Sequence, residues 1–331
     1  MATFKKRKDP SASHMLVCGV LLMAALLLLT RKGGRSDPCH SDETPILIVT
    51  INTGNDTDDY LESLRNHESY ASSQPGYDFL NAASLTTKDA GEESVHPYME
   101  KAYALRSILN SPSYRNYKYI LWIDRDAIFM DHTISIRQRL AEISAASRNE
   151  FEFDLYVAVE RWAWLNSGVL LFRNTDFSRK LVDEWIKTYS QREKNWKSQE
   201  TIHIGGIAKR FSDLFQRRWS CEDQGALIAL LAGYDGEQKW ETDRFDGLTV
   251  PHVLHTPDEE WTRLSTELIL ASRYQSNVKV VPQEWLNSNP RDHSKSAGNT
   301  HTFKPIIYHF NGQNNKKELI AQFNKEVKKC T

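Results

Sequence analysis

The feature that most restricts the fold of this chain is an apolar run, Tyr119 to Ile123, that leads directly into Asp124-Arg125-Asp126. Such a run is typical of a buried β-strand. In an open α/β sheet, ligands bind beyond the carboxyl ends of the strands, so both carboxylates are expected at the ligand-binding edge. Carboxylates there suit a divalent cation that also contacts phosphate oxygens. The segment therefore predicts an α/β fold and a metal-dependent enzyme acting on a phosphorylated substrate, with Arg125 in a surface ion pair.

Further strands and helices are predicted to alternate along the rest of the chain. Strands are predicted at 45–50, 77–80, 155–159, 167–172, 278–282 and 305–310, and helices at 58–70, 96–109, 177–189 and 224–231. The polar stretches 190–209 and 287–302 are expected to be surface loops. Alternating strands and helices indicate a mostly parallel sheet flanked by helices. The fold class is therefore α/β, in a single domain that covers residues 45–331.

The N-terminal segment predicts a membrane anchor. A basic cluster at 5–8 precedes the uncharged apolar run Met15 to Thr30, which as a helix would be roughly 24 Å long. A cleavable signal peptide is the alternative, but the run ends in Thr30-Arg31-Lys32 without the small residues of a cleavage site. By the positive-inside rule we predict a cytosolic tail (1–14), a signal anchor (15–30), a stem (31–44) and a lumenal domain (45–331).

Charge and cysteine content add weaker limits. The formal net charge is −1 and no strong basic patch stands out, which argues against nucleic acid as a partner. Outside the apolar run, Cys39, Cys221 and Cys330 allow at most one intramolecular disulfide, whose partners remain open. The sequence Asn55-Asp56-Thr57 is either an N-glycan acceptor in a lumenal chain or a chance match.

A second polar segment, Asn166-Ser167-Gly168, precedes the apolar run that ends at Phe172. We interpret it as a turn that enters a buried strand. Gly168 would let a ligand approach the backbone closely, because glycine has no Cβ. The Asn166 amide would hydrogen-bond sugar hydroxyls, or else it would form an Asx-turn with the local backbone.

Two more segments supply polar groups at the ends of predicted elements. Asp223 and Gln224 come just before an apolar helix, where they would face a sugar or cap the helix. His309 ends the strand at 305–310 and is followed by Gly312. An imidazole there would complete a Mn²⁺ shell, although a lone histidine is more often structural.

Together these motifs resemble those of retaining nucleotide-sugar glycosyltransferases with a GT-A fold, which is Rossmann-like, and most closely glycosyltransferase family 34. That family contains galactosyl-, mannosyl- and xylosyltransferases of the Golgi. The resemblance extends from about residue 45 to about residue 314. The matching segments are Tyr98 to Leu105, Trp122 to Ala127, Leu165 to Asn174, Glu222 to Leu227 and His309 to Gly312.

The resemblance implies a role for each candidate residue. Asp124, Asp126 and His309 would bind Mn²⁺, with Mg²⁺ as the alternative. The donor, a UDP- or GDP-sugar, would contact Asn166, Ser167, Gly168 and Gly312, with Asp223 and Gln224 as catalytic residues beside its sugar.

The family context implies a type II single-pass Golgi membrane protein that transfers a hexose or pentose to a glycan or glycoprotein acceptor. Family members often carry Asp-Ser-Asp in place of Asp124-Arg125-Asp126. They also place a lysine soon after the His-x-x-Gly turn, whereas here Lys316 comes later.

Two alternatives to a glycosyltransferase stay open at this point. One is a lumenal carbohydrate-binding or nucleotide-sugar-binding protein that keeps the fold without transfer activity. The other is a phosphatase of the haloacid dehalogenase type, which also places two aspartates after an apolar strand. That family expects Gly-Thr or a similar pair after the aspartates, whereas Ala127-Ile128 follow here.

Overall fold

A computed structural model of the chain describes residues 44–52, 60–85, 97–147, 152–160, 164–198, 223–231, 233, 270, 272–288, 305–310 and 315–330. The chain divides after Glu43, and the second unit, Thr44–Thr331, contains every described residue. The predicted tail, anchor and stem therefore lie outside the described residues, except Thr44. Within the described ranges, no helix has the length and apolar character needed to cross a bilayer.

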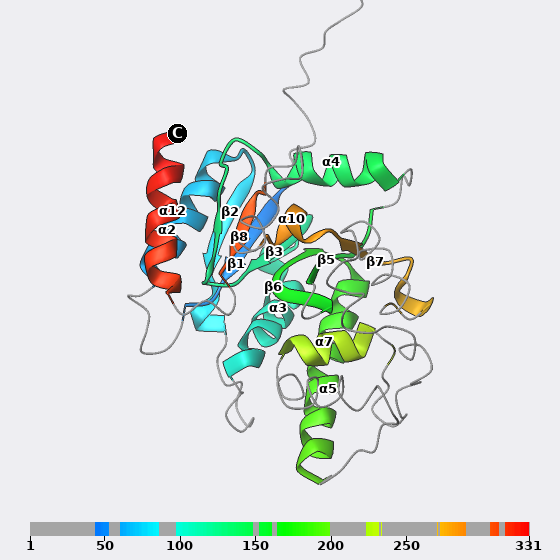
Figure 1. Cartoon of the computed structure of the whole chain (residues 1–331). Helices are drawn as coiled ribbons and strands as arrows, with labels where there is room; N and C mark the ends of the chain where they lie inside the picture. The colour runs from blue at the N-terminus through cyan, green and yellow to red at the C-terminus, as the bar shows by residue number, and fades with distance from the viewer. Residues whose placement is uncertain are drawn as a thin grey trace, which may run out of the picture. The chain divides into compact units, whose positions relative to one another are not determined.

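The core of the fold is a six-stranded sheet with the strand order β2-β1-β3-β6-β5-β7 (Figure 1). β1 runs parallel to β2 and β3, and β5 runs parallel to β7, while β6 runs antiparallel to both of its neighbours. The predicted mostly parallel sheet is therefore confirmed. The strands are β1 (Ile46–Thr50), β2 (Tyr77–Asn81), β3 (Tyr119–Ile123), β5 (Leu155–Glu160), β6 (Trp164–Arg173) and β7 (Val278–Val281).

A separate two-stranded antiparallel sheet, here called the ribbon, is formed by β4 (Ala127–Phe129) and β8 (Ile307–His309). The prediction placed a strand at 305–310 among the strands of one sheet. The structure corrects this, because β8 is shorter and pairs with β4 alone among the named strands. β4 was not predicted, since three residues after a turn carry no measurable periodicity.

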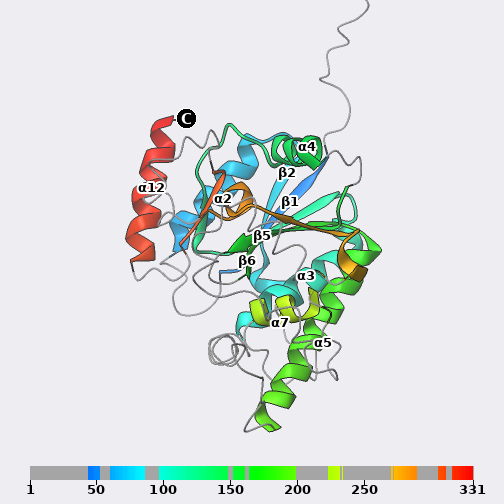
Figure 2. The same cartoon turned by 45° about the vertical axis from the view of Figure 1, so that its right-hand side comes forward.

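Alternate side chains of the central strands divide between two apolar clusters, one on each face of the sheet. On one face, Leu47, Ile120 and Trp122 pack in a cluster with side chains of three helices. Both views show these helices grouped on one side of the sheet (Figures 1 and 2). They are α3 (Glu100–Asn110), α5 (Asp176–Ser198) and α7 (Asp223–Leu231).

The opposite face packs against different helices and against the ribbon. Ile46, Ile48 and Leu121 share a cluster with residues of α2 (Leu61–Ser73), α4 (Ile136–Ser147), α10 (Gln283–Leu286) and both ribbon strands. The C-terminal helix α12 (Lys316–Cys330) contacts α2 and the ribbon, and both views place it beside α2 (Figures 1 and 2). Short 3₁₀ turns occur at Ala82–Leu85, Pro97–Met99, Pro112–Tyr114 and Ser272–Tyr274.

Three local predictions are wrong. Residues 190–198 were expected to be loop but continue α5, because their Gln, Arg, Glu and Lys residues favour helix without needing an apolar face. Asn287 and Ser288 were expected in a surface loop but are buried, and Ser288 bridges to Tyr308 of β8. The segment expected to be a turn at 166–168 lies inside β6.

Candidate metal and donor site

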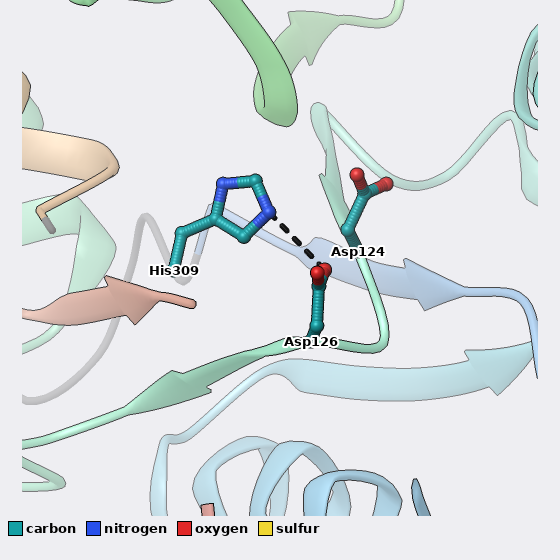
Figure 3. A group of neighbouring side chains, drawn as sticks. All are labelled: Asp124, Asp126 and His309. Atoms are coloured by element: carbon teal, nitrogen blue, oxygen red, sulfur yellow. Dashed lines mark hydrogen bonds and ion pairs between the residues drawn. The ribbon is translucent and has the colours of Figure 1, made fainter. Parts of the chain in front are cut away.

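The two predicted aspartates and the predicted histidine meet at one place (Figure 3). Asp124 follows β3, Asp126 precedes β4, and His309 ends β8 opposite Ala127 in the ribbon. One ligand atom from each of the three side chains lies within 4.8 Å of the others. His309 Nε2 lies 3.1 Å from Asp126 Oδ1. The ribbon therefore brings a residue from the end of the chain to the turn after β3.

This donor set fits a hard divalent cation. Carboxylate oxygens and an imidazole nitrogen suit Mn²⁺, and the two carboxylates also suit Mg²⁺. The turn that carries the aspartates is held by its own backbone, since Ala127 N–H donates to Asp124 O at 3.0 Å. Phe310 N–H donates to Asp126 O at 2.9 Å, which fixes the residue after His309 against the same turn.

The bulged part of β6 supports this cluster from the sheet. Val157 pairs with Leu170 but the next residue, Ala158, pairs with Asn166, so residues between 166 and 170 bulge from the ladder. Gly168 O accepts from Asp124 N–H at 2.7 Å. A Cβ on Gly168 would lie 2.2 Å from His309 Cε1. Gly168 is therefore needed for close packing against the histidine ring, and the predicted approach of a ligand to its backbone stays a prediction.

Asn166 and Ser167, which precede Gly168 in β6, are buried and bonded within the protein. Asn166 Oδ1 accepts from Gly168 N–H at 2.7 Å, which is the local contact of the Asx interpretation, although it occurs within a strand. Ser167 Oγ donates to Asp223 Oδ2 at 2.6 Å, and Ser167 N–H donates to Gln224 Oε1 at 3.1 Å. The bulge thus brings Asp223 and Gln224, at the start of α7, to the cluster of aspartates.

Lys101 of α3 joins these groups, and no role was predicted for it. Its ammonium lies 3.1 Å from Asp124 Oδ1 and 3.0 Å from Asp223 Oδ2. It also donates to Ser167 O at 3.2 Å and to Ser167 Oγ at 3.3 Å. The sequence held one signal, because Lys101 occupies an apolar helical stripe with Leu105 at i+4.

Burial and charge shift the pKa values of the site in opposite directions. Burial raises the pKa of Asp124, and Lys101 opposes this effect. Burial alone would also raise the pKa of Asp126, but His309 and Lys316 hold it well below its usual range. Burial alone would lower the pKa of Lys101, but Asp124 and Asp223 raise it above its ordinary value. Lys101 therefore remains a buried cation.

Lys316, in the first turn of α12, forms an ion pair with Asp126 Oδ2. The sequence left its role open, and the structure brings it to the cluster. The guanidinium of Arg125 lies 4.5 Å from the centre of the Tyr60 ring, and its predicted ion pair stays a prediction. Gly312 lies outside the described residues.

Part of the chain matches a known protein family. Residues 42–155 match the model of the galactosyl transferase GMA12/MNN10 family, which confirms the predicted resemblance to glycosyltransferase family 34 over that segment. "Xyloglucan 6-xylosyltransferase 1" of Arabidopsis thaliana is 26% identical over 184 residues, 54% of this chain and 35% of that protein. "Galactomannan galactosyltransferase 1" of Cyamopsis tetragonoloba is 22% identical over 234 residues, 66% of this chain and 49% of that protein.

A rice protein named "Probable glycosyltransferase 6" (Oryza sativa subsp. indica) is 29% identical over 126 residues, 37% of this chain and 23% of that protein. The chain thus matches less than half of the length of each of these relatives. Among solved structures, a glycosyltransferase involved in the glycosylation of the major capsid of PBCV-1 aligns with 86% of this chain and 99% of that chain. The sequence identity is 9% and the TM-score is 0.42.

Proposed function

We propose that this chain is a metal-dependent retaining glycosyltransferase with a GT-A fold, which moves a hexose or pentose from a nucleotide-diphosphate sugar to a glycan hydroxyl. The proposal places it in the Golgi as a single-pass type II membrane protein with a lumenal catalytic domain. The observation that carries the proposal is the cluster of Asp124, Asp126 and His309, assembled from separate segments beside Asp223 and Gln224.

The cluster would hold Mn²⁺, or Mg²⁺ in its place, together with the diphosphate of a UDP- or GDP-sugar. A bound divalent cation would neutralise charge that develops on the leaving diphosphate. The carboxylate of Asp124 is oriented by a protein partner, because Trp122 Nε1 donates to Asp124 Oδ1 at 2.7 Å. Oriented ligands are a general requirement of metal sites.

The start of α7 would face the donor sugar. Gln224 accepts from Ser167 through Oε1, so its amide NH₂ group is the part that can donate to a sugar hydroxyl. Asp223 Oδ2 accepts from Ser167 and pairs with Lys101, so its negative charge is balanced within the protein. A carboxylate held in this way is suited to positioning and electrostatic stabilisation more than to nucleophilic attack.

Retention of configuration would then follow from attack on the face that the diphosphate leaves. The leaving phosphate itself would take the proton of the acceptor hydroxyl, and the protein would hold both groups in place. Lys316, beside Asp126, is the cation positioned to balance the departing charge.

The test uses the purified full-length protein with Mn²⁺ and a panel of UDP- and GDP-sugars, and measures nucleotide release. We expect slow hydrolysis of one donor, abolished by a chelator and by Asp126→Ala. Asp176→Ala is the matched control, because the side chain of Asp176 is exposed at the start of α5, away from the cluster. Folded protein that binds no nucleotide with Mn²⁺ and releases none from any donor would overturn the proposal.

A second outcome separates the binding-protein alternative from the enzyme. Binding of UDP or GDP with Mn²⁺, without turnover of any donor when acceptor glycans are supplied, would favour a non-catalytic nucleotide-sugar-binding protein. Full transfer activity in Asp126→Ala with saturating metal would show that the assignment of the metal ligands is wrong.

A further inference from the structure

Each of the two aspartates of the cluster has its own lysine, and the two lysines are held very differently. Lys101 is surrounded by Asp124, Asp223 and both oxygens of Ser167, and its side chain is 10% exposed. Lys316 contacts Asp126, and its side chain is 26% exposed. Among the described residues, Asp126 is the only group in hydrogen-bond contact with the Lys316 ammonium.

Both oxygens of Asp126 are engaged by protein groups in this arrangement. His309 Nε2 contacts Oδ1 and the Lys316 ammonium contacts Oδ2. A divalent cation bound to the same carboxylate would lie next to the ammonium, and two cations at such a distance repel each other. The ion pair between Lys316 and Asp126 and the binding of a cation at Asp126 therefore oppose each other.

The backbone of α12 is fixed while the Lys316 side chain can change its partner. Ile320 packs with Ile128 and Phe310 against the outer surface of the ribbon. Asn324 is buried, accepts from Asn66 Nδ2 at 3.0 Å and donates to Glu62 O at 2.9 Å. The helix thus keeps Lys316 beside the cluster whichever anion the ammonium contacts.

We propose that Lys316 and a divalent cation compete for Asp126, and that the diphosphate of the donor ends the competition by accepting the Lys316 ammonium. This inference rests on the proposed function, since it assumes a metal and a nucleoside diphosphate at the cluster. A lysine can exchange one anion for another, because carboxylate and phosphate oxygens both accept charge-assisted hydrogen bonds from an ammonium. The consequence is positive coupling: metal alone binds weakly, and metal and nucleotide strengthen each other's binding.

The test measures Mn²⁺ binding to the full-length protein by the loss of the free Mn²⁺ signal in electron paramagnetic resonance, without nucleotide and with UDP or GDP. For Lys316→Gln without nucleotide, we expect Mn²⁺ to bind about tenfold more tightly than in the unaltered protein, which lies within the usual range of coupling between sites. At saturating Mn²⁺, UDP or GDP should bind this variant more weakly. The nucleotide should therefore increase Mn²⁺ affinity less in the variant.

Two further variants separate the local effect from a change in net charge. Lys325→Gln removes the same charge from an exposed position of α12, about 14 Å along the helix, and should leave Mn²⁺ binding unchanged. Lys316→Arg keeps the charge and should retain weak binding of Mn²⁺ alone. Thermal melting would establish that each variant is folded.

The results distinguish failure of this inference from failure of the proposed function. If Lys316→Gln binds Mn²⁺ no more tightly than the unaltered protein, while Mn²⁺ and nucleotide still bind together, the competition is wrong and the metal site stands. If neither protein binds Mn²⁺ with or without nucleotide, the metal site and the proposed function are both wrong.

Discussion

The candidate site has two halves that are supported by different parts of the fold. One, here called the sheet half, depends on β3, the β6 bulge, α3 and α7. It consists of Asp124, Lys101, Ser167 and Asp223. The other, here called the ribbon half, depends on the two-stranded ribbon and the first turn of α12. It consists of Asp126, His309 and Lys316.

The two halves differ in how their lysines are held. Elements of both halves pack in large apolar clusters, and the lysine of the sheet half has several partners. The ribbon is docked by polar groups of α2 as well, because Asn66 bonds both backbone groups of Phe129 and His67 Nε2 contacts Ala127 O at 2.8 Å. The difference therefore lies in the lysines. Lys101 is held by several partners, so we call the sheet half rigid, whereas Lys316 contacts Asp126, so we call the ribbon half adjustable.

The largest effect is expected from removing the lysine of the sheet half. Lys101→Met would leave the buried Asp223 and the partly buried Asp124 without their shared cation. Breaking a buried ion pair by removing one partner costs about 3–5 kcal/mol, so the free energy of unfolding should fall by about that amount. Urea unfolding followed by circular dichroism would measure it.

The matched comparison is Lys316→Met in the ribbon half. Lys316 is more exposed and has one carboxylate partner, so its loss should cost about 1 kcal/mol or less. Equal destabilisation by the two variants would contradict the distinction between a rigid and an adjustable half.

The free energy of unfolding should depend on pH through the contact between α2 and the ribbon, because that contact includes the buried His67. Burial lowers the pKa of His67 to about 4, and the hydrogen bond to Ala127 opposes this only partly. Because the unfolded chain takes up the proton near its usual pKa of 6.5, stability is complete above pH 6.5 and falls as the pH drops toward 4. The loss should amount to about 3 kcal/mol, since one pKa unit corresponds to about 1.4 kcal/mol.

His67→Gln tests this assignment, because its amide can still donate to Ala127 O but does not titrate. The variant should show a flatter dependence of unfolding free energy on pH between 6.5 and 4. Asp126 also has a lowered pKa, but its contribution is lost only as the pH falls below about 3.8, the usual value for an aspartate. An unchanged slope in His67→Gln would assign the acid sensitivity to other groups.

Much of the sheet half could be predicted from the sequence, because its parts follow long periodic segments. The apolar run before Asp124 gave β3, and the apolar run after Asp223 gave α7, both within a residue of their ends. Lys101 was missed as a site residue because a lone lysine in an apolar stripe does not identify its partners. Those partners come from β3, β6 and α7, which only tertiary packing brings together.

The ribbon half was predicted as residues but not as a structure. His309 was expected at a strand end and lies there, but the short β8 pairs with β4 instead of joining the central sheet. Pairing of two three-residue strands so far apart in sequence leaves no local pattern. The helix α12 was not predicted either, so the sequence could not settle whether Lys316 reaches the cluster.

An added methyl group at Gly168 should disturb the contact between the two halves. The Cβ of Gly168→Ala would lie 2.2 Å from His309 Cε1 and 2.7 Å from Nδ1, so the ring or the bulge must move. We expect Mn²⁺ affinity to fall about 10- to 100-fold, the range seen when the groups that orient metal ligands are removed. Electron paramagnetic resonance titration would measure it, with melting to establish that the protein is folded.

A double-mutant cycle shows whether the clash is the cause. In a His309→Ala background the ring is gone, so adding Gly168→Ala should weaken Mn²⁺ binding much less than it does alone. If the two substitutions lower Mn²⁺ affinity additively, the new Cβ acts instead through Asn166, whose Oδ1 it would approach to 2.9 Å.

The smallest effect is expected at Arg125, which lies between the two aspartates in sequence. Its guanidinium packs 4.5 Å from the centre of the Tyr60 ring, a contact worth about 0.5–1 kcal/mol at a partly exposed position. Arg125→Ser should therefore lower the free energy of unfolding by about that amount and leave Mn²⁺ and UDP or GDP binding within about twofold.

Arg125→Lys, which keeps the charge, is the control. A tenfold loss of nucleotide affinity in Arg125→Ser, restored by lysine, would instead mean that a positive charge at 125 assists the ribbon half in holding the diphosphate. In that case Lys316 would not be the only lysine or arginine side chain that balances its charge.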